Sequence, residues 1–220
     1  MNTLFDKSKA AIGSEWEAYT RHEFVRKLGD GSLPLEIFQD YLVQDYLFLI
    51  QFARANALAA YKSRSLADIH DGAAALQVIL KETQLHRRLT ERWGISLADL
   101  DAAPEKQATV AYTRYVLDSG MAGDLLDLHT ALAPCVIGYA EIGAELEPAL
   151  SGRSDHPYRE WISEYAGDDF QAGGRAAAER LDRLTAGGLT GDRFEALVGV
   201  FRTATRLEAD FWQQALDSAA

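Results

Sequence analysis

Hydrophobic residues recur along most of this chain at the spacing of an α-helix. Between positions 34 and 61, an apolar stripe steps by four, three, four and three residues through Phe38, Leu42, Asp45, Leu49 and Phe52. Residues three and four apart share one face of a helix, whereas a half-buried strand alternates every second residue. No Asn-Gly or Asp-Gly turn joins two runs of alternating type, so no β-hairpin is indicated. The pattern therefore predicts an all-α protein.

Prolines, glycines and capping residues mark the ends of the expected helices. We expect one or two helices over Asn2–Leu28, and further helices over 34–61, Leu66–Trp93, Glu105–Ser119, Leu125–Leu146, Tyr158–Tyr165, Asp168–Ala186 and from Thr190 or Asp192 to Leu216. No repeat period or low-complexity linker divides the chain. The prediction is one domain, residues 1–220, built as a bundle of seven to nine helices.

The stretch Leu125–Leu146 contains the only cysteine, Cys135. Leucines and a tyrosine, Tyr139, share its helix face, which places the thiol one turn from a phenol. Pro134 removes a backbone donor, so we expect it to kink or restart the helix just before Cys135. A thiol in this setting is a candidate nucleophile. A lone cysteine on an apolar face is more often a small buried hydrophobe, and the spacing leaves both interpretations open.

Two glycines follow that cysteine on the same predicted helix. Gly138 and Gly143 carry no Cβ, so each leaves room for another part of the protein to approach the backbone closely.

Composition narrows the class of protein. The 220 residues are 48% hydrophobic and 25% charged, as in ordinary globular proteins. A net charge of -11 repels phosphate backbones, so nucleic-acid binding is not expected. A single cysteine cannot form an internal disulfide, and the first residues lack a signal-peptide pattern, which favours the cytoplasm. The longest apolar candidate, Tyr41–Arg54, is too short for a membrane span and contains Asp45.

Two carboxyl groups lie in apolar surroundings. Asp45 sits within the stripe described above, so it must be paired or hydrogen-bonded, either in a structural salt bridge or to a ligand. Glu208 lies one helical turn before Phe211, where it is a candidate general acid or base beside an aromatic wall. The alternative for Glu208 is a solvated side chain that pairs with Arg202 or Arg206.

The spacing of acidic residues and histidines indicates whether the chain can hold a metal ion. Glu82 and His86 are four residues apart, but a di-iron bundle needs a second helix of this kind. The other histidines form no second pair within an apolar stripe, and one cysteine excludes a cysteine-rich zinc site. We expect no metal, and we interpret Glu82 and His86 as a buried polar pair.

Five segments together resemble a known family. In chain order they are FQDYLVQDYLFLIQFARANALAAYK, KETQLHRRL, ALAPCVIGYAEIG, WISEYAG and LEADFWQQA, and they are similar to the TenA/thiaminase II family over nearly the whole chain. The resemblance implies a heme-oxygenase-like fold without heme, no cofactor and a homotetramer. It also implies a small-molecule substrate: hydrolysis of thiamine or 4-amino-5-aminomethyl-2-methylpyrimidine to the hydroxymethylpyrimidine used in thiamine salvage.

The motif match also assigns site residues. Cys135 takes the place of the family's catalytic cysteine, Glu208 that of its catalytic glutamate, and Asp45 that of the aspartate that binds the aminopyrimidine edge. The aromatic positions of the pocket match Phe48, Tyr112, Tyr139, Tyr165 and Phe211. In this chemistry the thiolate adds to the pyrimidine ring, Glu208 protonates a ring nitrogen, and the adduct expels the leaving group before water adds.

Two other functions remain open at this point. A di-iron oxygenase on the same scaffold would need the metal set that the sequence lacks. A non-catalytic protein that binds thiamine or its pyrimidine would keep the pocket without turnover. The sequence does not rank thiamine, the aminomethylpyrimidine and its formyl derivative as substrates.

Overall fold

The structure, a computed structural model, describes residues 3–219 and their side chains except those at positions 85, 86, 89 and 219. The prediction of an all-α protein is confirmed for this range. Its helices are α1 (Leu4–Ala11), α2 (Gly13–Thr20), α3 (Glu23–Asp30), α4 (Leu35–Lys62), α5 (Leu66–Arg92), α6 (Leu97–Ala102), α7 (Gln107–Ala122), α8 (Leu125–Leu146), α9 (Arg159–Ala166), α10 (Asp168–Leu184) and α11 (Gly191–Leu216), with short 3₁₀ helices η1 (Glu147–Leu150) and η2 (Asp217–Ala219).

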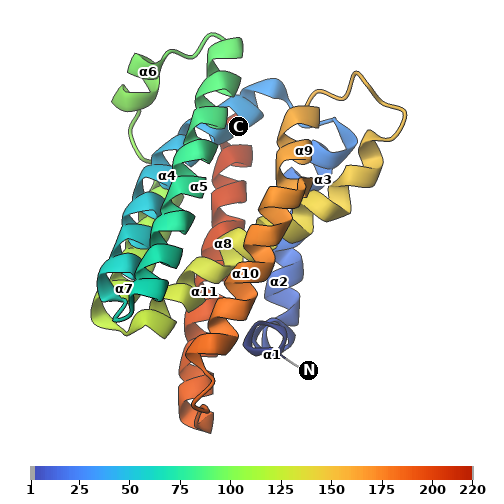
Figure 1. The fold of residues 1–220 in the computed structure, drawn as a ribbon. Coiled ribbons are helices and arrows are strands. Elements are labelled where there is room, and N and C mark those ends of the chain that lie inside the picture. Colours follow the sequence, from blue (N-terminus) through green and yellow to red (C-terminus); the bar gives the residue numbers. More distant parts are fainter. Residues whose placement is uncertain (1–2, 220) are drawn as a thin grey trace.

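The long helices pack around α8. Figure 1 shows α8 running diagonally behind α10, with α4, α5 and α7 on one side and α11 behind it. α8 contacts α4, α7, α9, α10 and α11. By length and composition, the stretch Leu125–Leu150 would suffice to cross a membrane, but 67% of its apolar window is buried inside the fold. It is longer than Tyr41–Arg54, the longest candidate expected from the sequence, and it is a core helix.

α8 is continuous through Pro134, so the expectation that proline restarts the helix is wrong. One missing backbone donor does not end a helix that neighbours enclose on several sides. The carbonyl oxygen of Pro134 accepts a hydrogen bond of 3.3 Å from the Tyr19 hydroxyl. A Cβ on Gly138 would lie 2.3 Å from the Tyr19 ring, so this glycine provides the close approach that the sequence predicted.

The described residues contain more helices than the seven to nine predicted. The N-terminal segment forms α1, α2 and α3, where one or two helices were expected, because Ile12 separates the first two and the pair Arg21 and His22 separates the second from the third. The linker before α7 contains α6, which begins at a capping box between Ser96 and Asp99. Hydrophobic periodicity does not register one-residue breaks or a six-residue helix. The predicted N-cap Thr190 is confirmed, since its side chain accepts from the amide of Arg193.

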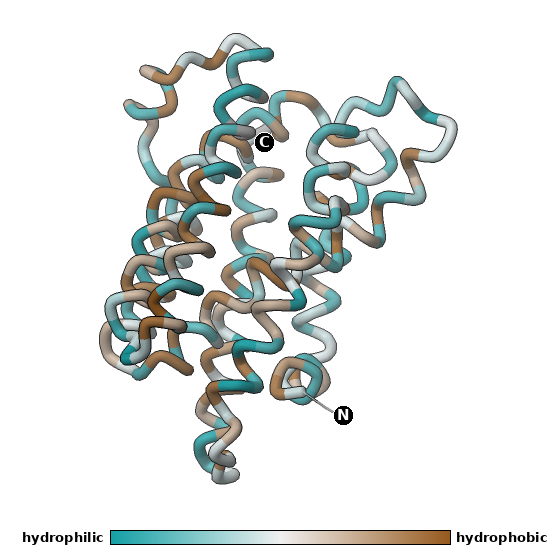
Figure 2. Tube along the Cα trace, in the orientation of Figure 1, coloured by the Kyte–Doolittle hydropathy of each residue, from teal (hydrophilic) through white to brown (hydrophobic). Residues whose placement is uncertain are grey.

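The core is rich in large aromatic residues. Figure 2 shows hydrophobic segments along α4 and α5 and through the middle of the molecule. Trp16, Trp161, Trp212, Tyr19, Tyr41, Tyr112 and Tyr165 are fully buried. Several of these side chains surround the cavity described next, so the same packing that holds the helices together also fixes the walls of the candidate site.

Candidate active site

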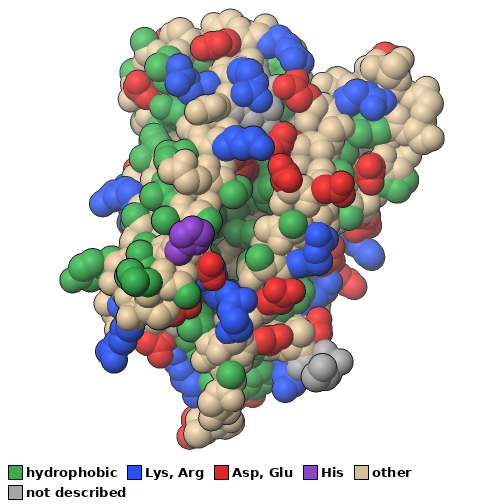
Figure 3. Space-filling view, viewed as in Figure 1, with side chains coloured by type: hydrophobic (Ala, Val, Ile, Leu, Met, Phe, Trp, Pro, Cys, Tyr) green, Lys and Arg blue, Asp and Glu red, His purple; other side chains and the backbone are tan. Residues whose placement is uncertain are grey.

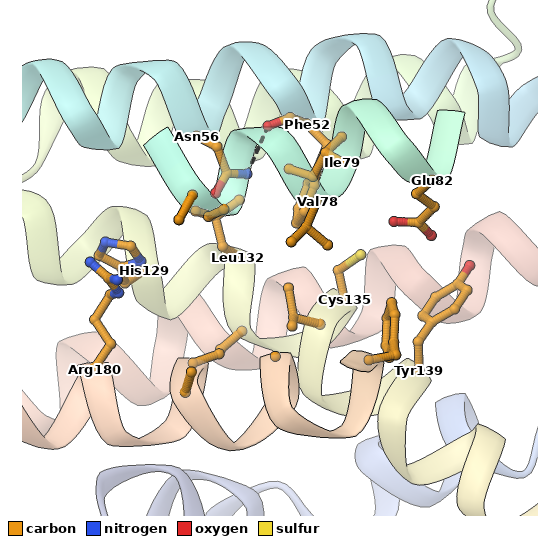
Figure 4. Close-up of a pocket in the computed structure, with 18 of the residues that line it drawn as sticks. Phe52, Asn56, Val78, Ile79, Glu82, His129, Leu132, Cys135, Tyr139 and Arg180 are labelled. Atoms are coloured by element: carbon orange, nitrogen blue, oxygen red, sulfur yellow. Dashed lines mark hydrogen bonds between the residues drawn. The ribbon is translucent and has the colours of Figure 1, made fainter. Parts of the chain in front are cut away.

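A cavity of about 410 Å³ lies between α4, α5, α8 and α10. This volume is in the range of roughly 300–1,000 Å³ that small-molecule sites occupy. Figure 3 shows the surface hollowed between α5 and α10, with hydrophobic side chains inside the hollow and charged side chains around it. Figure 4 shows Cys135 within the cavity, between Glu82 and Tyr139 at one end and His129 and Arg180 at the other.

Cys135 lies close to the carboxyl group of Glu208, which α11 contributes, and the two groups affect each other's pKa. Burial raises the pKa of the thiol well above its usual value, and the nearby carboxyl groups of Glu208, Glu82 and Asp45 raise it further. The thiol is therefore neutral at rest. A nucleophilic thiolate forms only if a neighbouring group accepts its proton.

Glu208 is nearly inaccessible, with 1% of its surface exposed. Burial raises the pKa of Glu208 to about 8. Tyr112 donates a hydrogen bond of 2.9 Å to its Oε1 and lowers the pKa, whereas the charge of Asp45 raises it. Glu208 is therefore mostly protonated at neutral pH. The alternative of a solvated glutamate is wrong, and Arg202 instead lies 3.4 Å from Glu15.

Asp45 lies on α4 and is buried beside the cavity. The Tyr41 hydroxyl donates a hydrogen bond of 2.9 Å to Asp45 Oδ2, and it accepts one of 3.1 Å from the indole of Trp161. This chain of bonds fixes the orientation of the carboxyl group. The sequence analysis did not identify Tyr41, although it precedes Asp45 by one helical turn and shares its face.

Five of the eight predicted site residues line the cavity, namely Asp45, Phe48, Cys135, Tyr139 and Tyr165. The other three lie behind its wall. Glu208 reaches Cys135, Tyr112 reaches Glu208, and Phe211 packs 5.7 Å from the ring of Phe48. The structure thus places all eight in one contiguous group, in which Phe211 supports the aromatic wall from behind.

Glycine 143 sets the position of Tyr165. A Cβ on Gly143 would lie 2.4 Å from the backbone carbonyl carbon of Tyr165, so only glycine lets the end of α9 pack this closely on α8. The approach brings the rings of Tyr165 and Tyr139 to 5.0 Å between centroids. It is the second close contact that the sequence predicted at these glycines.

Glu82 is a cavity residue whose place the sequence analysis missed. It lines the cavity from α5, and its Oε1 accepts a hydrogen bond of 2.7 Å from the Tyr165 hydroxyl. Its predicted partner His86 has a side chain outside the described residues, so that pairing stays a prediction. Within the part of the chain that the structure describes, no group of three or more His, Cys, Asp or Glu side chains is placed to hold a metal ion.

Comparison with known proteins identifies relatives over nearly the full chain. The model of the TENA/THI-4/PQQC family matches residues 10–218. A protein of Halalkalibacterium halodurans named aminopyrimidine aminohydrolase is 41% identical over 215 residues, which cover 97% of this chain and 93% of that one.

Solved structures show the same fold. A TenA family protein of Silicibacter sp. TM1040, named a transcription regulator, superposes with a TM-score of 0.90 and 42% identity, covering 97% of this chain and 96% of that one. A domain from Shewanella denitrificans described as having a heme oxygenase-like fold superposes with a TM-score of 0.77 at 13% identity, covering 98% and 93% of the two chains. This likeness shows that the predicted heme-oxygenase-like fold is correct.

Proposed function

The chain belongs to the TENA/THI-4/PQQC family, and we propose that it hydrolyses 4-amino-5-aminomethyl-2-methylpyrimidine, and also thiamine, to 4-amino-5-hydroxymethyl-2-methylpyrimidine. One observation carries this proposal: Cys135, in the wall of an aromatic cavity, lies next to Glu208, a buried carboxyl group whose pKa is raised to about 8. The relative named aminopyrimidine aminohydrolase supports the choice of substrate.

Glu208 and Cys135 act together as a proton relay in this proposal. The carboxyl group, with a pKa of about 8, holds a proton at neutral pH and gives it to a ring nitrogen of the bound pyrimidine. The resulting carboxylate then accepts the proton of the neighbouring Cys135 thiol. The thiolate forms only when the ring has become electrophilic, which suits a thiol whose pKa burial has raised.

Asp45 and the aromatic side chains orient the ring. Asp45 accepts a hydrogen bond from the exocyclic amine of the pyrimidine, and Tyr41 and Trp161 hold its carboxyl group in place. Phe48 and Tyr139 offer aromatic faces for a flat ring. This arrangement supports recognition of an aminopyrimidine rather than of an aliphatic amide.

Atoms and charges balance over the whole reaction. The Cys135 sulfur adds to a ring carbon, and electrons of the adduct expel ammonia or the thiazole from the exocyclic methylene carbon. Water then gives its hydroxyl to that carbon and its proton to the expelled ammonia or, when thiamine is the substrate, to the solvent. Finally the carbon–sulfur bond breaks, and the aromatic ring and the thiol are restored.

The test is a paired assay on the purified protein. The aminomethylpyrimidine and thiamine are each incubated with enzyme, and hydroxymethylpyrimidine and ammonia are followed. Formation of hydroxymethylpyrimidine from either substrate is the expected result, and the ratio of the two kcat/KM values ranks them. Tight binding without product would contradict hydrolysis and favour the binding protein. Iron bound in near-stoichiometric amount would favour the oxygenase.

The same proposal includes a cytoplasmic homotetramer. Exposed apolar residues support self-association: Tyr61 at the end of α4, and Leu66 and Leu80 on α5, all have large exposed fractions. Large apolar side chains exposed together on neighbouring helices are typical of an interface.

A further inference from the structure

The cavity extends well beyond the groups that the proposed reaction uses. Along α8 its lining runs from Tyr139 past Cys135 and Leu132 to His129. At 1.5 Å per residue, His129 lies about 9 Å from Cys135 along the helix axis. Ammonia, the leaving group of the aminomethylpyrimidine, needs almost none of this length. The space on this side of Cys135 is therefore available to a longer leaving group.

The middle of this extension is apolar. The side chains that line it come from four helices: Phe52 from α4, Val78 and Ile79 from α5, Leu132 from α8 and Ala177 from α10. Burial here gives favourable binding free energy to an apolar chain or heterocycle, but not to a charged group.

The far end of the cavity is polar and contains two guanidinium groups. Arg180 and Arg183 of α10 approach the same oxygen, Asp71 Oδ2, at 3.1 and 3.3 Å. Each contact uses one Nη2 atom, and a guanidinium has five N–H donors. The other nearby acid, Asp68, accepts a hydrogen bond of 2.6 Å from the Ser65 hydroxyl. One carboxylate thus faces two guanidinium groups at the end of the cavity.

His129 adds an uncharged imidazole beside these arginines. Its Nε2 atom is buried and has no hydrogen-bond partner within the described part of the chain. Burial, followed by the positive charges of Arg180 and Arg183, lowers the pKa of His129 to about 4, so the imidazole is neutral at pH 7. Figure 4 shows His129 and Arg180 next to each other at this end. Buried polar atoms in proteins normally have a partner, and here a ligand would provide it.

We propose that Arg180, Arg183 and His129 bind an oxyanion at the far end of a long leaving group. The substrate class is then an aminopyrimidine whose leaving amine or heterocycle has an apolar middle and a terminal carboxylate or phosphate. This inference rests on the proposed function, because it assumes that the pyrimidine lies beside Asp45 and Cys135. The methylene–nitrogen bond breaks as before: water gives its hydroxyl to the carbon and its proton to the leaving group. Guanidinium groups match the paired oxygens of such anions.

Two matched substrate pairs test the inference. The first compares the N-butyl and N-(3-carboxypropyl) derivatives of the aminomethylpyrimidine, which differ at the terminal carbon alone. The second compares thiamine with thiamine monophosphate. In at least one pair, we expect kcat/KM of the wild-type protein to be about ten-fold higher for the oxyanion, as charge-assisted hydrogen bonds produce. The pair that shows the preference identifies the anion as carboxylate or phosphate.

The variant for this test is R180Q/R183Q, and its matched control is R175Q, an exposed arginine on the same helix. The double variant should lose the preference and hydrolyse the unsubstituted aminomethylpyrimidine within about two-fold of the wild-type rate. R175Q should keep both the preference for the oxyanion substrate and the wild-type rate on the unsubstituted compound. No preference in either pair, or an equal loss on all substrates in the double variant, would overturn the inference. Turnover of the unsubstituted compound by the wild type reports on the proposed function alone. If the wild type did not turn over this compound, the proposed function and this inference would both be overturned.

Discussion

Two exchangeable protons lie side by side at the proposed site, one on the Cys135 thiol and one on Glu208. Burial raises the pKa of both groups, and each affects the pKa of the other. Neither is charged at rest, so the protein avoids a bare buried anion until substrate arrives. This property follows from the packing around the two side chains, because the same residue types on a surface would ionise at their usual pH.

The raised pKa of Glu208 predicts how stability depends on pH. The folded protein holds this proton up to about pH 8, whereas the unfolded chain loses it near 4.5. Between these values the folded state binds more protons, so the free energy of unfolding falls as pH rises. The lowered pKa of His129 acts in the opposite direction, but only below about pH 6.5. Between pH 6.5 and pH 8, we expect the titration of Glu208 to lower the free energy of unfolding by about 2 kcal/mol.

Urea unfolding of the wild type and E208Q at pH 6.5, 7.25 and 8 measures this effect. The free energy of unfolding of E208Q should hardly change over this pH interval, because glutamine does not titrate. Equal slopes for the two proteins would show that Glu208 does not hold its proton in the folded state.

Tyr112 provides a second prediction, now on activity. If Glu208 must be protonated to act, turnover should fall above about pH 8. The hydrogen bond from Tyr112 stabilises the carboxylate and lowers its pKa, so Tyr112→Phe should move this alkaline limit to higher pH. The pH profile of kcat measures the shift. Tyr115→Phe, on the same helix but bonded weakly to Val200, is the control and should leave the limit unchanged. A shift to lower pH would contradict the assignment.

At the scale of the helices, α8 brings the site together through its glycines. Gly143 lets the end of α9 pack on α8, and Tyr165 enters the cavity as a result. Gly143→Ala would force its Cβ into the backbone of Tyr165, which does not yield easily. We expect a loss of about 1–3 kcal/mol in the free energy of unfolding, and weaker substrate binding, measured as a higher KM.

Gly199→Ala on α11 is the matched control. A Cβ there meets no atom within 4 Å, so the substitution should be neutral or stabilise by about 0.5–1 kcal/mol through helix propensity. If Gly143→Ala behaved like the control, the close packing of α8 and α9 would not be what positions Tyr165.

The helices show what the sequence could predict. The long apolar stripes predicted α4, α8 and α11 closely, because a buried face several turns long repeats its pattern many times. The breaks around Ile12 and Arg21 and the short α6 escaped, because they depend on caps and tertiary contacts rather than on periodicity. The helix does not restart at Pro134, because local propensity is overridden when a helix is enclosed by its neighbours.

The candidate site divides in the same way. Motif similarity identified all eight residues that the structure brings together, but it assigned Glu82 no place in the pocket. The sequence did not predict the polar end of the cavity at His129, for a physical reason. Its residues come from α5, α8 and α10, and none of these helices alone shows a motif.

At the scale of the whole molecule, the exposed apolar residues of α5 predict self-association. Leu66 is 85% exposed and Leu80 46% exposed. Light scattering after size exclusion should give four times the chain mass of 24.3 kDa, and L66Q/L80Q should shift it toward smaller species. The control M121Q, at a comparably exposed position on α7, should leave the measured mass unchanged. A monomeric wild type would contradict the tetramer.

The measurement that tests the account most directly is the turnover of Cys135→Ala on 4-amino-5-aminomethyl-2-methylpyrimidine, followed as ammonia release. Without the thiol no ring adduct can form, so kcat/KM should fall by about a thousand-fold or more. The far-UV circular dichroism and the Tm should stay close to those of the wild type, which shows that the fold is retained. Turnover within about ten-fold of the wild type, in a folded variant, would contradict nucleophilic catalysis by Cys135.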